Sequence, residues 1–473
     1  MTRIIVLIIS IIAASHMGLT AQRTLSLEEC IKIAQDNSIK IKQAFLSKKN
    51  TEIQEKFARQ QLLPSLSANS TLSYHLGRSI DPTTNTYLAQ SFMSQGINLN
   101  TGFTIYNGTK LRNSIKQAIT NRQASEEEIQ QMKRDIALLV ANTYLAILYT
   151  NENISNAHSQ YNATKEQLDK MNKLIEAGLK APASSLNLEA QLLADEQKII
   201  TYQNELDKNY LNLKNLLLLD DKENIKIIIP KLGIDDYTAS EINSYNELYN
   251  AAMQHYPAYQ ASQYKIKSAI LQKKIAQGSL LPSLNIYAGL STNYADKAKK
   301  FSFEPTIKYQ NFIIDGEQKK VGIPSVKTTV LDYPYMSQLE DNLGIGLSLQ
   351  LNIPIYSKYA YRAQIQNAKI KIESEKLSQE LIVQDLKTKI QNAIADKRAA
   401  KMQYKAAGKT YEARHTAFEN TKKQFESGTI SSYDYINSRA LLEQAQNNMT
   451  LAKYQYIFKS IILDFYLGKN IKL

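Results

Sequence analysis

Apolar side chains recur at every seventh position along four long stretches of the chain. This spacing puts them on one narrow seam of an α-helix, the surface by which helices pack into coiled coils. No proline interrupts 110–177 or 358–427, and at 1.5 Å per residue each would form a helix roughly 100 Å long. The pattern predicts two pairs of long antiparallel coiled-coil helices, at about 110–177 with 183–219 and about 358–427 with 432–467. The seam positions are Ile154, Tyr161, Leu168, Ile175, Leu192, Ile199, Leu206 and Leu213 in the first pair, and Tyr404, Tyr411, Phe418, Phe425, Leu442, Met449, Tyr456 and Leu463 in the second.

Four shorter stretches alternate between apolar and polar residues, which is the two-residue period of a β-strand. In the longest, 343–355, every odd position is leucine or isoleucine, and the even positions from 344 to 352 are glycine, serine, glutamine or asparagine. A sheet half-buried in a soluble protein would show the same alternation. A strand of this length, however, spans about 40 Å, which suits a tilted membrane crossing better than a globular domain. We therefore expect two barrel strands within about 66–107 and two within about 284–355, each with one face in water and one in lipid.

The pentapeptide LLPSL occurs twice, at 62–66 and at 280–284. Proline is excluded from helix interiors and holds the preceding residue extended, so Pro64 and Pro282 each mark a switch from helix to strand. An offset of 218 residues relates the two copies up to this point. From 105–118 and 355–368 onward, an offset of 250 holds without a gap for over a hundred residues.

The chain is thus an internal duplication. The sequence predicts a first repeat at 22–220, a connector at 221–244 and a second repeat at 245–473. Each repeat reads helix, strand, loop, strand, long helix, turn and long helix. The larger offset leaves 32 extra residues in the second copy, which we assign to a long surface loop at 296–340.

The N-terminus indicates export from the cytoplasm. Arg3 is followed by an apolar run at 4–14 and by small Ala21, the features of a secretory signal peptide at 1–21. The formal net charge is +13, but lysine and arginine alternate with aspartate and glutamate over the whole length. This interleaving is typical of a solvated helical surface and argues against nucleic acid as a partner.

Four strands cannot form a closed barrel by themselves. An open sheet edge in lipid leaves backbone N–H and C=O groups unpaired at several kcal/mol each, so membrane-spanning sheets must close. Single-chain barrels begin at about eight strands. Several chains must therefore share one barrel, although this argument does not choose between two, three and four.

The duplicated LLPSL, the four alternating strands and the paired helices meeting at EAGLKAPASSLNLEA and ESGTISSYDYINSRA resemble the TolC family of bacterial outer-membrane channels. The resemblance implies a homotrimer, with four strands per chain in a shared 12-stranded barrel in contact with outer-membrane lipid, and a helical tunnel in the periplasm. It also implies a periplasmic adaptor protein and an inner-membrane transporter as partners. The expected fold is mainly α with a membrane β part, located in the bacterial outer membrane. The expected function is the exit duct of a tripartite efflux or type I secretion system.

The resemblance further assigns roles to the turns between the long helices. Gly178, Leu179, Gly428 and Thr429 would dock the adaptor, and Asp434, Asn437, Ser184 and Phe425 would form the periplasmic gate. The chain departs from the family here, because Asn437 stands where an acidic residue is frequent and Ser184 replaces an aspartate. Locally, Asp434 also fits a capping box with Ser431, so gate and cap both remain open for it.

Two further assignments complete the expectations. Tyr106 and Tyr356, at strand ends, are expected to lie at the membrane interface as aromatic anchors. The histidines are scattered without metal-ligand spacing, and the chain carries no phosphate loop or nucleophile motif, so we expect no enzyme activity, catalytic residue, metal or cofactor. The alternative function is a soluble periplasmic coiled-coil scaffold whose strands form a small sheet.

Overall fold

The computed structural model describes residues 23–80, 85–88, 91–220, 223–230, 245–469 and 471. The expected signal peptide lies outside this range, as does the connector apart from 223–230. The chain divides into two compact units, considered separately below. The helical unit comprises Met1–Glu52, Thr120–Lys267 and Glu373–Leu473, and the unit that contains the sheet comprises Ile53–Ile119 and Ser268–Ile372.

The helices of the two repeats correspond in length as well as in order. Their four helices have 11, 22, 67 and 35 residues in each copy. The first copy has α2 (Leu27–Asn37), α3 (Ile39–Gln60), α4 (Lys110–Glu176) and α5 (Ala183–Leu217); the second has α6 (Tyr245–His255), α7 (Pro257–Gly278), α9 (Ala360–Glu426) and α10 (Ser432–Tyr466). No described helix is both long enough and apolar enough to cross a membrane.

The duplication extends to unusual backbone conformations. Four positions with positive φ in the first copy have a counterpart with positive φ exactly 250 residues later, although the residue types differ at three of them. Most residues other than glycine avoid this left-handed region, so its recurrence reflects a shared backbone and not shared side chains. The pairs are Gly108 and Lys358, Thr109 and Tyr359, Gly178 and Gly428, and Leu218 and Gly468.

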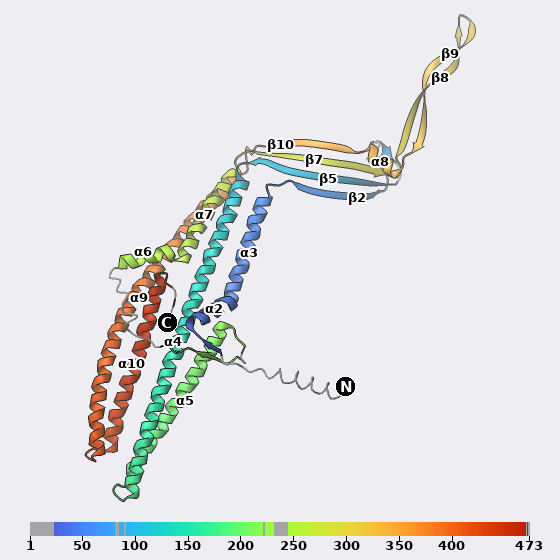
Figure 1. The fold of residues 1–473 in the computed structure, drawn as a ribbon. Coiled ribbons are helices and arrows are strands. Elements are labelled where there is room, and N and C mark those ends of the chain that lie inside the picture. Colours follow the sequence, from blue (N-terminus) through green and yellow to red (C-terminus); the bar gives the residue numbers. More distant parts are fainter. Residues whose placement is uncertain are drawn as a thin grey trace, which may run out of the picture. The chain divides into compact units, whose positions relative to one another are not determined.

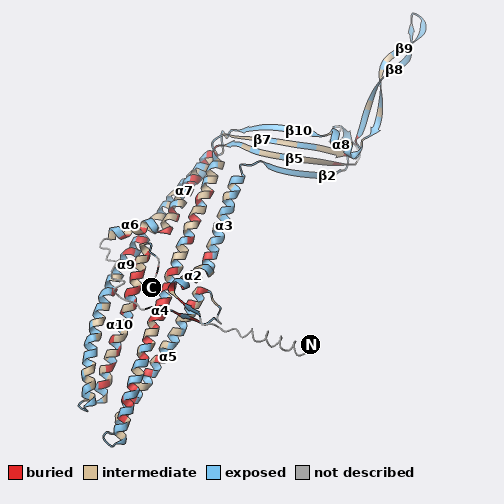
Figure 2. Ribbon diagram, viewed as in Figure 1, coloured by how far each residue is buried: buried red, intermediate tan, exposed pale blue. Residues whose placement is uncertain are grey.

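The predicted seam is buried as the heptads require. Every heptad position named above is buried or half-buried in the helical unit (Figure 2). A hydrophobic core joins α4, α5 and α10 to α2 and to a two-stranded parallel ribbon of β1 (Arg23–Leu25) and β6 (Ile225–Ile227). The Tyr144 hydroxyl donates to the carbonyl oxygen of Ile228 at 2.7 Å and lies 3.2 Å from that of Leu25, so it links α4 to this ribbon.

The sheet has four antiparallel strands in the order β10-β7-β5-β2 (Figure 1). They are β2 (Ser65–His75), β5 (Phe92–Asn107), β7 (Ser283–Ala295) and β10 (Gly344–Asn352). Pro64 and Pro282 each directly precede the first residue of a strand, β2 and β7. Among the described residues, β10 and β2 are the two edges of the sheet.

The expected loop at 296–340 is wrong. This segment contains a hairpin of two 16-residue strands, β8 (Lys299–Ile314) and β9 (Glu317–Asp332), followed by α8 (Tyr335–Asp341). The hairpin turns at Asp315 and Gly316, both with positive φ, as two-residue hairpin turns of this type require. The Asp-Gly pair between alternating residues was the sequence signal for it. The Gln338 side chain of α8 bonds to both the N–H (2.9 Å) and the C=O (3.1 Å) of Ala295, which fastens α8 to β7.

Candidate functional site

One face of the sheet is apolar across all four strands. The register places Ile345, Leu290 and Leu99 in one row, with Ala68 of β2 completing it. The side chains of this face stand in solvent in the single chain: Leu66, Ile345 and Leu347 are all more than 70% exposed. A large exposed apolar surface of this kind marks contact with a membrane or another protein.

The opposite face is lined by small polar residues. Gly346, Gly289, Asn100 and Ser67 form one row, and Gly344, Ser291, Asn98 and Asn69 form the next. The row on the other side includes one large residue, Tyr287. A shallow hollow on this face is lined by short side chains, among them Ser67, Gly289 and Gly346. Uncharged donors and acceptors on a hollowed face can hydrogen-bond water without holding a fixed charge.

Charge is absent from these strands. Within their bounds, β2, β5, β7 and β10 contain no aspartate, glutamate, lysine or arginine, in a chain that carries 57 basic and 44 acidic residues. The β8–β9 hairpin differs, since lysines and carboxylates recur along it, for example in the pair of Lys299 and Asp332 at 2.7 Å. Charged side chains are costly in hydrocarbon, so the uncharged band fits a membrane and the hairpin fits water.

The proposed gate residues lie at the tips of the helix pairs, but two of them are exposed. Asp434 accepts from the Ser431 hydroxyl at 2.7 Å, and its N–H donates to the same oxygen at 3.2 Å, which completes a capping box at the start of α10. Asn437 is exposed one turn further on, and Ser184 is half-buried in α5. Phe425 stacks on Tyr435 at 4.7 Å between ring centroids.

The predicted docking residues form the exposed ends of the helix pairs. Gly178 and Gly428 have φ of +72° and +76° and end α4 and α9 as left-handed caps. Leu179 is 69% exposed, and the Thr429 hydroxyl donates to the Gln424 carbonyl at 2.8 Å.

Sequence reasoning missed a buried ionic cluster above the tips, which we call the Arg439 cluster: Arg439, Asp195, Glu443, Lys198 and Thr164. Arg439 bonds to the Thr164 hydroxyl and lies 3.4 Å from Asp195 and 3.3 Å from Glu443, while Lys198 reaches Glu443 at 2.7 Å. Asp195, Arg439 and Glu443 are at most 5% exposed. The cluster joins α4, α5 and α10, and so links the first helix pair to the second.

A sequence signal for this cluster existed. Asp195 stands three residues after Leu192 and four before Ile199, so a carboxylate lies on an apolar seam. Buried carboxylates require paired cations, which predicts a partner on a facing helix. The position alone does not say which arginine or lysine supplies it.

Polar links continue along the boundary between α4 and α10. The Gln446 amide donates to Asn156 at 2.9 Å, and Lys453 pairs with Glu152 at 2.8 Å. On the tip side of the Arg439 cluster, Tyr435 packs in a small apolar cluster, and burial raises the pKa of its hydroxyl. The two helix pairs therefore meet through polar contacts flanked by apolar ones.

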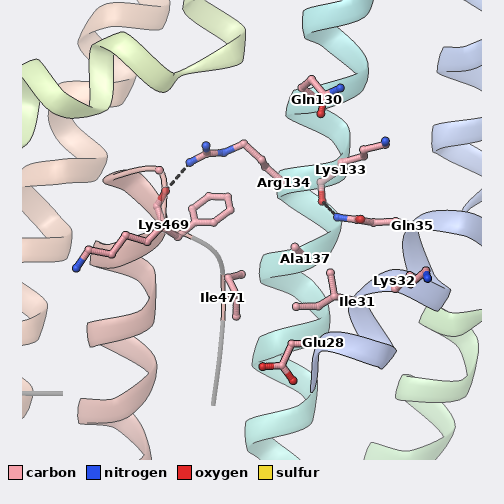
Figure 3. Close-up of a pocket in the computed structure, with 12 residues that line it drawn as sticks. Glu28, Ile31, Lys32, Gln35, Gln130, Lys133, Arg134, Ala137, Lys469 and Ile471 are labelled. Atoms are coloured by element: carbon pink, nitrogen blue, oxygen red, sulfur yellow. Dashed lines mark hydrogen bonds between the residues drawn. The ribbon is translucent and has the colours of Figure 1, made fainter. Parts of the chain in front are cut away.

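A pocket elsewhere in the helical unit is formed by packing of the C-terminal segment against α2 and α4 (Figure 3). Arg134 donates to the carbonyl oxygen of Phe465, and Gln35 donates to that of Lys133 at 3.0 Å. Burial lowers the pKa of Arg134. The side chains around the pocket thus tie backbone segments together, a structural role.

Comparison with known proteins shows which family and which relatives this chain is similar to. The model of the family described as outer membrane efflux protein matches residues 30–217 and 322–469. Outer membrane protein TolC of Vibrio cholerae is 24% identical over 424 residues, covering 87% of this chain and 83% of that protein. An uncharacterized protein of Haemophilus influenzae is 23% identical over 224 residues, and the chain spans 47% of that relative's length.

Two solved structures share the fold over most of their length. CusC has a TM-score of 0.75 at 14% identity, and VceC from Vibrio cholerae has a TM-score of 0.74 at 13% identity. Each match covers 94% of this chain, with 92% of CusC and 96% of VceC. The likeness confirms the predicted fold class, mainly α with a β part that contributes four strands per chain.

Proposed function

Because this chain belongs to the outer membrane efflux protein family, we propose that three copies of it form an exit duct across the outer membrane. Each of the three chains supplies four strands to one closed barrel, and the helical units form the tunnel in the periplasm. The observation that carries the proposal is the uncharged four-stranded sheet, apolar on one face and small and polar on the other, with two unpaired edges. Closure satisfies those edges, and the two faces suit lipid outside and water inside.

A soluble periplasmic scaffold accounts less well for the sheet. Such a sheet would cover its apolar face with helices, as antiparallel sheets in soluble proteins do. Within the described structure that face is instead exposed, with Ile345 at 80%.

Adaptor docking at the helix tips has support from exposure and shape. Gly178, Leu179, Gly428 and Thr429 form turns whose backbone N–H groups bond back to the ends of α4 and α9, and the apolar side chain of Leu179 is exposed there. A periplasmic adaptor that binds there would connect the duct to an inner-membrane transporter. The cargo class, small molecules or proteins, follows from the partner and not from this chain.

The gate we propose combines the tips with the Arg439 cluster. Opening the tunnel at its periplasmic end requires the two helix pairs of each chain to move apart, and the cluster is the buried polar contact that joins them. Nearer the tip, Phe425 and Tyr435 of the second helix pair pack in one apolar cluster with Met171 of α4 and Leu188 of α5. Ser184 and Asn437 also lie in this region. Asp434 lies in the same region, in the capping box with Ser431 that begins α10.

Two adjacent lysine substitutions in β10 test the proposed function. Leu347→Lys puts a charge on the apolar face and Ser348→Lys puts the same charge on the polar face, one residue away. A lysine facing lipid costs about 2–4 kcal/mol near the midplane, whereas one facing water costs little. We therefore expect Leu347→Lys to abolish the detergent-extracted trimer in outer-membrane fractions.

Ser348→Lys should assemble normally and shift the ion selectivity of single channels in planar bilayers toward anions. Equal tolerance of both lysines, with release of the protein by urea instead of detergent, would support the soluble scaffold and exclude the duct.

A further inference from the structure

The open edges of the sheet raise the question of how neighbouring subunits align. We propose that the contacts between subunits repeat those between the two copies within one chain, so that Ser348 of β10 lies opposite the partner subunit's Ser73 in β2. The inference rests on the proposed function, because it requires a shared barrel. It adds the register of the closing strand pair and the residues that meet across the subunit boundary.

The internal contact that serves as the reference is the pairing of β5 with β7. Strand β5 belongs to the first copy and β7 to the second, and Asn98 lies opposite Ser291, with Leu99 opposite Leu290. By the same repeat, β10 is the counterpart of β5 at an offset of 250 residues, and β2 is the counterpart of β7 at an offset of 218. The matching helix bounds and left-handed residues show that these offsets hold in the backbone.

Applying the offsets to this pairing gives a definite register. Asn98 becomes Ser348 and Ser291 becomes Ser73, while Leu99 becomes Leu349 and Leu290 becomes Leu72. Leucine is thus predicted to meet leucine on the apolar face, and serine to meet serine on the polar face. Shifting the register by one residue would place apolar side chains on the polar face, so the alternation excludes it. Registers that differ by two residues keep the faces matched, and the repeat chooses one of them.

Exposure agrees with a missing neighbour at these positions. Leu99 and Leu290, which are paired within the chain, are 36% and 38% exposed, whereas Leu349 and Leu72 are 64% and 66% exposed. On the adjoining helices, Leu271 of α7 is 7% exposed and its counterpart Ile53 of α3 is 57% exposed. In each comparison, the residue that has a partner within the chain is the more buried one, and its counterpart in the other repeat is the more exposed one.

The same operation extends to the helices next to the sheet. The Gln117 amide of α4 donates to the Gln272 side-chain oxygen of α7 at 3.0 Å. The counterparts are Asn367 of α9 and Gln54 of α3, which keep an amide at each position. We expect Asn367 to reach the partner subunit's Gln54.

The repetition has one structural exception, at the junction between sheet and helix. A Cβ atom on Gly108 would lie 2.2 Å from the Gly278 carbonyl oxygen, so the junction within the chain leaves no room for a side chain. The counterparts are Lys358 and Gln60, which both carry long side chains. The subunit boundary must therefore be wider there than the internal boundary.

Paired cysteines test the register. Ser73→Cys is combined in turn with Gly346→Cys, Ser348→Cys or Gln350→Cys, three positions on the water-facing side that differ by two residues each. The native Cys30 is 0% exposed and burial raises its pKa to about 12, so we expect it to form no cross-links in this experiment. Asn98→Cys with Ser291→Cys is the control for a pair within one chain, because its cross-link leaves the chain mass unchanged. Gln54→Cys with Asn367→Cys is a second pair, in the helices, for the case where strand variants fold poorly.

We expect oxidation of outer membranes to give a covalent trimer on denaturing gels roughly tenfold faster for Ser348 than for either offset position, since diagonal pairs lie too far apart for a disulfide. Fastest cross-linking from Gly346 or Gln350, or none from any pair in a protein that still runs as a trimer, would overturn the register and leave the duct intact. A detergent-extracted monomer without cross-links would overturn the proposed function and this inference together.

Discussion

Arg439 is a side chain whose removal would leave two buried carboxylates, Asp195 and Glu443, short of a cation. Uncompensated buried charge costs about 3–5 kcal/mol, far more than an exposed ion pair contributes. Asp434 is different, since it is exposed and bonded to the residue that caps its own helix. Arg439 therefore links the two helix pairs, whereas Asp434 caps a single helix.

Arg439→Met should loosen the contact between the two helix pairs of each chain. We expect a larger basal current through single channels in planar bilayers and a lower temperature of trimer dissociation. Asp434→Ala is the matched control and should cost about 1 kcal/mol of helix stability with little change in current. A large change in current from Asp434→Ala, with none from Arg439→Met, would show that the capping box, and not the Arg439 cluster, holds the tunnel closed.

The strand-to-helix junctions show how one backbone is built from different side chains at the scale of elements. In the first copy, Gly108 takes the left-handed conformation freely and packs against Gly278. In the second copy, Lys358 takes the same conformation at φ of +47°. A non-glycine residue in this region carries about 1–2 kcal/mol of backbone strain, so the second junction is maintained at a cost.

Gly108→Ala should destabilise the junction by more than this strain alone, because its Cβ would also overlap the Gly278 carbonyl oxygen. Lys358→Gly, the matched change in the other copy, should be neutral or stabilising by up to about 1 kcal/mol. The heat-induced loss of trimer, followed on gels, measures both. Equal effects of the two substitutions would show that the close approach of Gly108 and Gly278 does not limit the junction.

At the scale of the whole molecule, the hairpin of β8 and β9 is the main departure from duplication. Its strands pair with each other along their length, and its described polar links to the remainder of the unit lie at its base, as in the pair of Lys300 and Asp341 at 2.7 Å. The four-stranded sheet includes neither hairpin strand, and α8 bonds to β7 of that sheet through Gln338. Assembly and hairpin should therefore be separable.

Replacement of residues 304–327 by Asn-Gly would join Phe303 directly to its partner Thr328 through a two-residue turn. We expect the shortened protein to form the same detergent-extracted trimer with unchanged single-channel conductance. The yield of trimer from outer membranes, compared with the full chain, is the measurement. Loss of the trimer would show that the hairpin takes part in assembly.

Local periodicity was sufficient to predict much of this protein from its sequence. The seam of heptads, the alternating strands, the switch at Pro64 and Pro282 and the duplication are each written in neighbouring residues, because helix and strand periods depend on short-range geometry. The Asp315-Gly316 pair between alternating residues is likewise a local signal, and it indicates the hairpin at 299–332 where a loop was expected.

Other features depended on which distant residues meet. The partners of Asp195 come from helices far along the chain, and nothing near position 195 identifies Arg439 among the basic residues. The register of β5 with β7, and with it the predicted register between subunits, was likewise decided only when the two copies folded against each other. Periodicity specifies which face of an element is buried, but long-range packing chooses the surface that covers it.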